Sequence, residues 1–204
     1  MSGVEPALIA VYADESCLGN GREGDNPGGA AGLIECVRPL SGELVRRDFW
    51  ISDRATTNNR MALRSVIEAF RILGGKGRRQ RVVFTSDSNY IVKGMSEWLH
   101  GWIARGWARK GGAIENLELW KEAAELVRPH DVQWAWVRGH DGHPQNEYAN
   151  DLAIRAARDL TSSGGAVESG FEQWLAAKTA KGAVRAPTPF PPAGFRAPRP
   201  LPRG

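Results

Sequence analysis

The sequence predicts an α/β domain around a mixed five-stranded sheet, in which three antiparallel strands precede two parallel strands and helices flank the sheet. Three observations predict this class. Three strand-like runs with turn-like connections occupy the first 52 residues. From about residue 58 the apolar residues recur at helical spacing. Beyond that point helix-like segments alternate with two more apolar runs, an order that favours parallel strands joined by right-handed crossovers.

The first three strands are expected to form an antiparallel meander. They occupy residues 8–13, 28–38 and 43–52. A long glycine-rich stretch, "GNGREGDNPGG", joins the first two strands, and the turn "PLSG" joins the second to the third. Because so short a turn brings neighbouring strands side by side, the second and third strands should pair antiparallel.

The later elements follow from apolar spacing and from helix-ending residues. Leu63, Val66 and Phe70 recur at helical spacing and predict a helix over 58–73, capped by one of residues 56–59 and ended by the glycines at 74 and 75. The remaining elements are expected at 81–86 (strand), 89–104 (helix, broken near Gly94), 114–127 (helix), 132–137 (strand), 144–160 (helix) and 171–180 (short helix).

Composition indicates a soluble globular protein with one main domain. The 204 residues are 42% hydrophobic and 25% charged, and only two are cysteines, which is ordinary for such proteins and too few cysteines for a disulfide framework. No run approaches the roughly 20 apolar residues of a membrane helix, and no signal peptide is evident. We therefore expect a cytoplasmic monomer that does not bind membranes. Its main domain should span 1–160, with a short appended helix in 161–182 and a disordered Pro- and Arg-rich tail over 183–204.

The net charge of +4 comes from the tail. The arginines of residues 183–204 account for all of it, so that residues 1–182 are formally neutral. Any argument for a polyanionic partner of the main domain therefore depends on local clusters, namely "KGRRQR" at 76–81 and the basic residues within 105–110. The tail itself either binds nucleic acid non-specifically or serves solubility.

Two carboxylates follow apolar strands in the same way. Asp14 comes after the run 8–13, and Asp87 comes after the run 81–86. If these strands are neighbours, both carboxylates converge at the edge where open α/β sheets bind ligands. Two carboxylates about 4 Å apart repel by about 4 kcal/mol at an effective dielectric constant of about 20, and Mg²⁺ binds carboxylates, waters and phosphate. The pair predicts a metal site, the alternative being acids that cap helices or face water.

A third polar cluster lies in "VRGHDGHPQNEYANDLA". Glu147, Asn150 and Asp151 share one face of the predicted helix. This face is either aimed at the metal or solvated, with Asp151 paired to Arg155. His140 lies in a glycine-flanked loop, where an imidazole can move and transfer a proton.

Six segments together resemble type 1 ribonuclease H over residues 8–160. They are "DESCLGN", "TTNNRMAL", "TSDSNY", "EWLHGW…RGW", "ENLELW" and "WVRGHDGHPQNEYANDLA". The resemblance implies a ribonuclease H-like fold and an endonuclease that hydrolyses the RNA strand of RNA–DNA hybrids with two Mg²⁺ or Mn²⁺ ions. It also implies that Asp14 bridges both metals, that Asp87 ligates one, and that His140 assists leaving-group protonation or product release. The implied contacts with the hybrid are made by Asn20, Thr57, Asn58, Asn59 and Asn89, and by a substrate-handling protrusion at "WLHGWIARGW".

The chain departs from this family pattern at acidic positions. Ala62 stands where the family has a metal-binding Glu, Asn150 stands where it has an Asp, and Glu15 replaces a Gly. We expect Glu15 to compensate for Ala62, although in a regular strand it would point away from the face of the preceding Asp. Asn150 keeps one carbonyl oxygen as a ligand. Asp151, and after it Glu147, is expected to supply the missing charge.

Three functions are compatible with this pattern. The retained Asp14, Asp87 and His140 favour an active ribonuclease H with a remodelled acidic site. Ala62 and Asn150 favour a hybrid-binding module with weak or no catalysis, and a nuclease acting on another nucleic acid is the third. The extra acids Glu15, Glu23 and Asp25 favour the active enzyme, because carboxylates near the phosphates of a nucleic acid need cations between the two negative groups.

Overall fold

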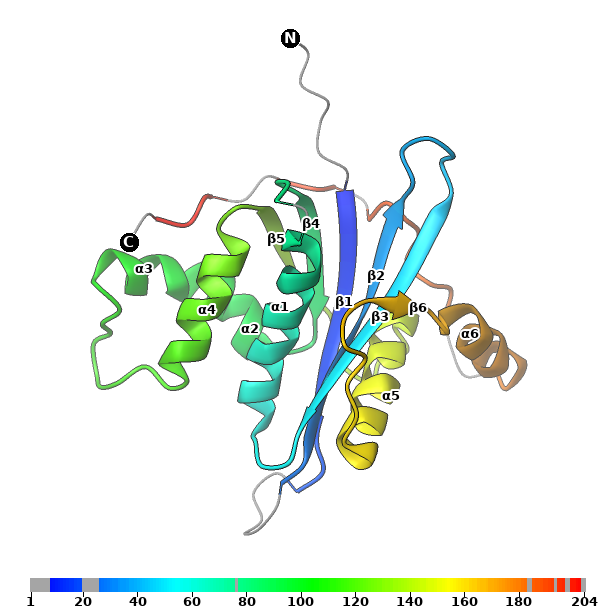
Figure 1. The fold of residues 1–204 in the computed structure, drawn as a ribbon, viewed down its shortest axis with the longest axis horizontal. Helices are drawn as coiled ribbons and strands as arrows, with labels where there is room; N and C mark the ends of the chain where they lie inside the picture. The colour runs from blue at the N-terminus through cyan, green and yellow to red at the C-terminus, as the bar shows by residue number, and fades with distance from the viewer. Residues whose placement is uncertain are drawn as a thin grey trace.

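The computed structural model describes residues 8–19, 26–75, 77–182, 185–192, 194–196 and 199–202. It confirms the predicted mixed sheet flanked by helices (Figure 1). The strands are β1 (Leu8–Cys17), β2 (Gly28–Val37), β3 (Leu44–Asp53), β4 (Arg81–Ser86), β5 (Asp131–Trp136) and β6 (Val167–Glu168). Their order is β5-β4-β1-β2-β3-β6, and β1 pairs antiparallel with β2 and parallel with β4.

The sheet differs from the prediction in two places. A sixth strand, β6, pairs antiparallel with β3 through Arg47↔Glu168 and Asp48↔Val167. It has two residues, too few to show a strand period in the sequence. In addition, β1 continues past residue 13 to Cys17, because β2 pairs with it as far as Gly28. Asp14 and Glu15 therefore lie inside a strand rather than after its end.

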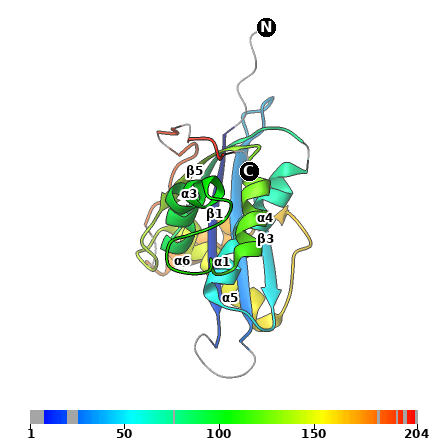
Figure 2. The same ribbon diagram turned by 90° about the vertical axis from the view of Figure 1, so that its left-hand side faces the viewer.

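One face of the sheet packs against the first group of helices. Val11 and Ala13 of β1 belong to the core on this face, together with Val66, Phe70 and Trp120 of the helices. Figure 2 shows the molecule with α3 and α4 toward the viewer. These elements are α1 (Asn58–Gly74), α2 (Asn89–Lys93), the π-helix η1 (Gly94–Trp98), α3 (Leu99–Ala104) and α4 (Leu117–Val127).

The irregularities on this face have local causes. The predicted break near Gly94 is present as η1, and a Cβ at Gly94 would come within 2.0 Å of the Trp120 indole. Only glycine therefore permits this close packing. The helix predicted from residue 114 begins at Leu117, because Asn116 has a left-handed backbone with φ of 55°.

The other face of the sheet packs against α5 (Pro144–Asp159) and α6 (Phe171–Ala180). Ala10 and Tyr12 of β1 belong to this second core, together with residues of both helices. Because successive side chains of a strand alternate between faces, Asp14 starts from the α5 face and Glu15 from the α1 face.

The described residues of the C-terminal segment 183–204 contact the domain. Thr188 hydrogen-bonds to Gln145, Phe190 packs against the core beneath α5, and Leu201 packs against the core on the α1 face. In Figure 1 this orange-to-red segment passes behind the sheet from α6 toward the side of α3. The Pro- and Arg-rich composition of this segment suggests little burial, whereas Thr188, Phe190 and Leu201 contact residues of the domain.

The helices in the described part of the chain are too short or too polar to cross a membrane.

A buried polar contact between β3 and α5 gives a stability prediction. The Tyr148 hydroxyl donates to Asp48 Oδ2 at 2.5 Å, and both residues are buried. Tyr148→Phe removes a donor from a carboxylate whose pKa is already raised by burial. We expect the free energy of unfolding to fall by about 1–2 kcal/mol, measured by urea unfolding.

The matched control is Tyr12→Phe. The buried Tyr12 hydroxyl has no hydrogen-bond partner among the described residues. Its removal should leave the free energy of unfolding unchanged or higher. Equal losses in the two variants would show that the contact with Asp48 is not the stabilising feature.

Candidate active site

Three carboxylates from two neighbouring strands meet at one end of the sheet. Asp14 and Glu15 lie in β1, and Asp87 directly follows β4. One oxygen of each lies within 4.8 Å of the others. The pair expected from the sequence is thus brought together, with Glu15 as a third member.

Glu15 reaches this cluster because the edge of β1 is open there. Pairing between β1 and β4 ends at Tyr12↔Thr85, whereas β1 continues along β2 to Cys17. Beyond Tyr12, side chains from both faces of β1 can therefore reach the unpaired edge of this strand, where Asp87 lies. Glu15 starts from the face whose core also contains the fully buried Ala62.

The cluster holds more negative charge than its surroundings stabilise. Burial, followed by the charge of Asp87, raises the pKa of Asp14 to about 8. Burial and the charges of Asp14 and Asp87 also raise the pKa of Glu15, and burial raises that of Asp87. A divalent cation would remove this repulsion, and carboxylate oxygens are the ligands that Mg²⁺ prefers. The donor set therefore fits such a cation.

The loop after β5 brings an imidazole to the cluster. A Cβ at Gly139 would lie 2.2 Å from Asp87 Oδ2, so the loop passes directly against this carboxylate. The next residue, His140, is exposed with a left-handed φ of 53°, and its charge offsets part of the rise that burial causes in the pKa of Asp87. Trp136, which is half-exposed, donates from Nε1 to the Asp87 backbone oxygen at 2.9 Å. The loop that carries His140 therefore lies beside the cluster.

Helix α5 contributes Asn146, which the sequence reasoning missed. Asn146 is buried, and its Nδ2 donates to Asp14 Oδ2 at 3.1 Å. It precedes Asn150 by one helical turn on the same face, and this spacing is the signal that could have found it. Asn150 is half-buried one turn further along α5. Glu147 accepts from Gly142 N at 3.3 Å and adds negative charge near Asp14.

Asp151 lies outside this cluster. Its Oδ2 accepts from Trp174 Nε1 at 2.7 Å and pairs with Lys178 Nζ at 3.2 Å. Both partners belong to α6, on the side of α5 that packs against that helix. The helical step of about 100° from Asn150 to Asp151 turns the side chain away from the carboxylates.

The expected substrate-binding residues lie at two helix starts. Thr57 caps α1 and accepts from Arg60 N at 3.4 Å, and Asn58 and Asn59 open that helix. Asn89 opens α2 and is exposed. These helices begin where β3 and β4 end, at the end of the sheet that holds the carboxylates, and helix starts attract phosphate groups. The remaining candidate, Asn20, lies outside the described residues.

The segment expected to form the substrate-handling protrusion, residues 98–107, lines an open groove of about 370 Å³. Tyr90, Trp98 and Trp102 contribute aromatic side chains to it. The basic residues of its lining are Arg105, Arg109 and Lys110. Aromatic and basic groups side by side suit the bases and phosphates of a nucleic acid strand.

Known proteins with similar sequences share one family. The RNase H family model matches residues 6–158. The ribonuclease H of Syntrophotalea carbinolica is 40% identical over 161 residues, which cover 77% of this chain and 95% of that protein. The ribonuclease H of Cupriavidus pinatubonensis is 42% identical over 156 residues, which cover 76% and 98% of the two chains.

A solved structure matches nearly the whole chain. LC9-RNase H1, a type 1 RNase H with the type 2 active-site motif, is 60% identical with a TM-score of 0.90, covering 98% of this chain and 96% of that chain. The match therefore extends into the C-terminal segment. Family model, relatives and structure agree, and the chain belongs to the ribonuclease H family.

Proposed function

We propose that this protein is a metal-dependent endonuclease that hydrolyses the RNA strand of RNA–DNA hybrids with a remodelled acidic site. The observation that carries the proposal is the meeting of Asp14, Glu15 and Asp87, with oxygens within 4.8 Å, in a chain of the ribonuclease H family. Three converging carboxylates repel a phosphate backbone unless cations lie between them. A module that only binds hybrids gains nothing from such a cluster.

Asp14, Glu15 and Asp87 would hold two Mg²⁺ or Mn²⁺ ions, with the Asn150 carbonyl oxygen as a further ligand. When bound, such ions activate the attacking water and stabilise the leaving oxygen. Glu15 supplies the charge that Ala62 lacks. LC9-RNase H1, which is 60% identical to this chain, supports a changed active-site motif here, because it is a type 1 RNase H with the type 2 active-site motif.

The other residues position the substrate and move a proton. Asn146 orients Asp14 through its 3.1 Å hydrogen bond. His140, beside Asp87, donates a proton to the departing 3′ oxygen or assists product release. The starts of α1 and α2 bind phosphates of the hybrid. The groove lined by Trp98 and Trp102 contacts the DNA strand of the hybrid.

A weakly active or inactive hybrid-binding module is the second candidate. Ala62 and Asn150 favour it, because each replaces an acid of the family pattern. Fewer charges bind cations more weakly. This candidate predicts binding of hybrids without cleavage.

The test is cleavage of a labelled RNA–DNA hybrid with Mg²⁺ and then with Mn²⁺. Single-stranded RNA, double-stranded RNA and double-stranded DNA of the same sequence are the comparison substrates. We expect cleavage of the RNA strand in the hybrid alone. Binding of the hybrid without cleavage with either metal would favour the binding module, and preference for another substrate would favour a different nuclease.

A further inference from the structure

The C-terminal segment contacts the loop and helix start that adjoin the candidate active site. We name its described residues, 185–192, 194–196 and 199–202, the C-terminal strap. Arg185 contacts both carboxylate oxygens of Asp141 at 3.3 and 3.4 Å. Thr188 N donates to Gln145 Oε1 at 3.1 Å, and Gln145 Nε2 donates to Thr188 O at 2.8 Å. Thr188 Oγ1 lies 2.9 Å from His143 Nε2.

Of these contacts, the ones made by Thr188 matter most. The side chains of Arg185 and Asp141 are 70% and 45% exposed, and exposed ion pairs contribute little. Gln145 is fully buried, and its amide pairs with the backbone of Thr188 much as a neighbouring strand would. Hydrogen bonds made away from water are the costly ones to break.

The Thr188 hydroxyl contacts the nitrogen of His143 that does not cap the helix, Nε2. His143 caps α5, with its Nδ1 accepting from Asn146 N at 3.4 Å. A nitrogen that accepts is unprotonated, so the proton of the neutral imidazole lies on Nε2. Nε2 then donates to Thr188 Oγ1. Without this acceptor the alternative tautomer, which cannot cap α5, becomes more populated.

These contacts run without interruption from the strap to Asp14. His143 caps the first turn of α5, and in that turn Asn146 donates to Asp14 Oδ2 at 3.1 Å. We propose that Thr188 is a positioning residue, which holds His143 and the first turn of α5 so that Asn146 orients Asp14. This inference rests on the proposed function of the carboxylate cluster.

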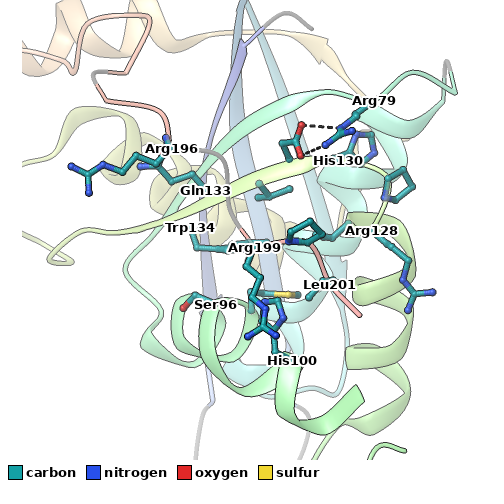
Figure 3. A pocket seen from close by; sticks show the side chains of 16 residues that line it. Arg79, Ser96, His100, Arg128, His130, Gln133, Trp134, Arg196, Arg199 and Leu201 are labelled. Atoms are coloured by element: carbon teal, nitrogen blue, oxygen red, sulfur yellow. Dashed lines mark hydrogen bonds and ion pairs between the residues drawn. The ribbon is translucent and has the colours of Figure 1, made fainter. Parts of the chain in front are cut away.

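The far end of the strap is anchored separately. The Arg81 guanidinium lies over the Phe195 ring at 4.6 Å, and Arg196 N donates to Gln133 Oε1 at 2.7 Å. Arg199 and Leu201 line a cavity of about 620 Å³. Figure 3 shows Arg199 beside His100 in this cavity. Because these anchors lie on β4, β5 and α3 and not on α5, a substitution at Thr188 should leave the rest of the strap in place.

The experiment compares Thr188→Val, which keeps the shape but removes the hydroxyl, with Thr188→Ser, which keeps the hydroxyl. Thr179→Val, at an exposed threonine of α6, is the matched control. For Thr188→Val we expect kcat on the hybrid to fall about tenfold, the lower end for loss of a group that orients a metal ligand, with KM unchanged. Thr188→Ser and Thr179→Val should match the parent.

A second measurement does not depend on activity. Nitrogen-15 NMR of His143 should report the Nε2–H tautomer in the parent and a mixture in Thr188→Val, with thermal unfolding confirming that each variant is folded. If the parent cleaves no substrate, the proposed function fails. The NMR measurement then decides by itself whether Thr188 holds His143 in the tautomer that caps α5. An unchanged tautomer, an equal loss in Thr188→Ser, or a raised KM with unchanged kcat would each overturn the inference.

Discussion

Asp14→Asn should abolish cleavage of RNA–DNA hybrids while the protein stays folded. The substitution keeps the shape of the side chain and removes the charge at the centre of the carboxylate cluster. We expect the rate to fall by more than about 10³-fold, the upper range for loss of one electrostatic contributor. The measurement is single-turnover cleavage of a labelled hybrid in Mg²⁺ and in Mn²⁺. Asp159→Asn, at an exposed position of α5, is the matched control.

The same variant makes a prediction about stability in metal-free buffer. Burial raises the pKa of Asp14 from 3.8 to about 8 in the folded protein, so the folded state binds more protons than the unfolded state between these values. The contribution of Asp14 to the free energy of unfolding therefore falls as the pH rises from about 4 to about 8. Asp14→Asn lacks this dependence and should be at least as stable as the parent at neutral pH. Near-parental cleavage by a folded variant would place the metal site elsewhere.

Glu15→Gln should lower the cleavage rate and raise the metal concentration needed for the half-maximal rate. Its carboxylate lies within 4.8 Å of those of Asp14 and Asp87, and Ala62 contributes none. Loss of a group that only orients a metal ligand costs about 10–100-fold, so loss of a ligand should cost at least tenfold. Metal titrations of the cleavage rate measure both effects. Glu118→Gln, at an exposed position on α4, is the control.

A rescue experiment separates a lost ligand from a lost local contact. Ala62 is fully buried on the face from which Glu15 starts. Ala62→Glu alone should destabilise the protein, because it buries a further carboxylate beside the three that already form the cluster. Combined with Glu15→Gly, it should restore the rate and the metal requirement toward those of the ordinary family arrangement. If Glu15→Gln changes neither quantity, Glu15 is a bystander. The next acids to test are Glu23 and Asp25 of the loop between β1 and β2, which lie outside the described residues.

The sequence by itself determined the order of the elements and the meeting of Asp14 with Asp87. Both depend on local patterns, because apolar spacing sets strand or helix and two parallel neighbouring strands end at the same edge. The break at Gly94 was also predictable, since glycine interrupts helical spacing within its own segment. Comparison of the sequence with the family pattern is enough to identify the acids lost at positions 62 and 150 and the acid gained at position 15.

The tertiary structure alone decided how the site is completed. Glu15 joins the cluster because β4 stops short and leaves the edge of β1 open, which no local pattern encodes. Asn146 reaches Asp14 across 132 residues of chain, and Asp151 turns to Trp174 instead of the carboxylates. The strap, whose composition predicts disorder, is held by single side chains such as Thr188. Side-chain direction and pairing between distant segments arise from packing, so the periodicity of either segment does not contain them.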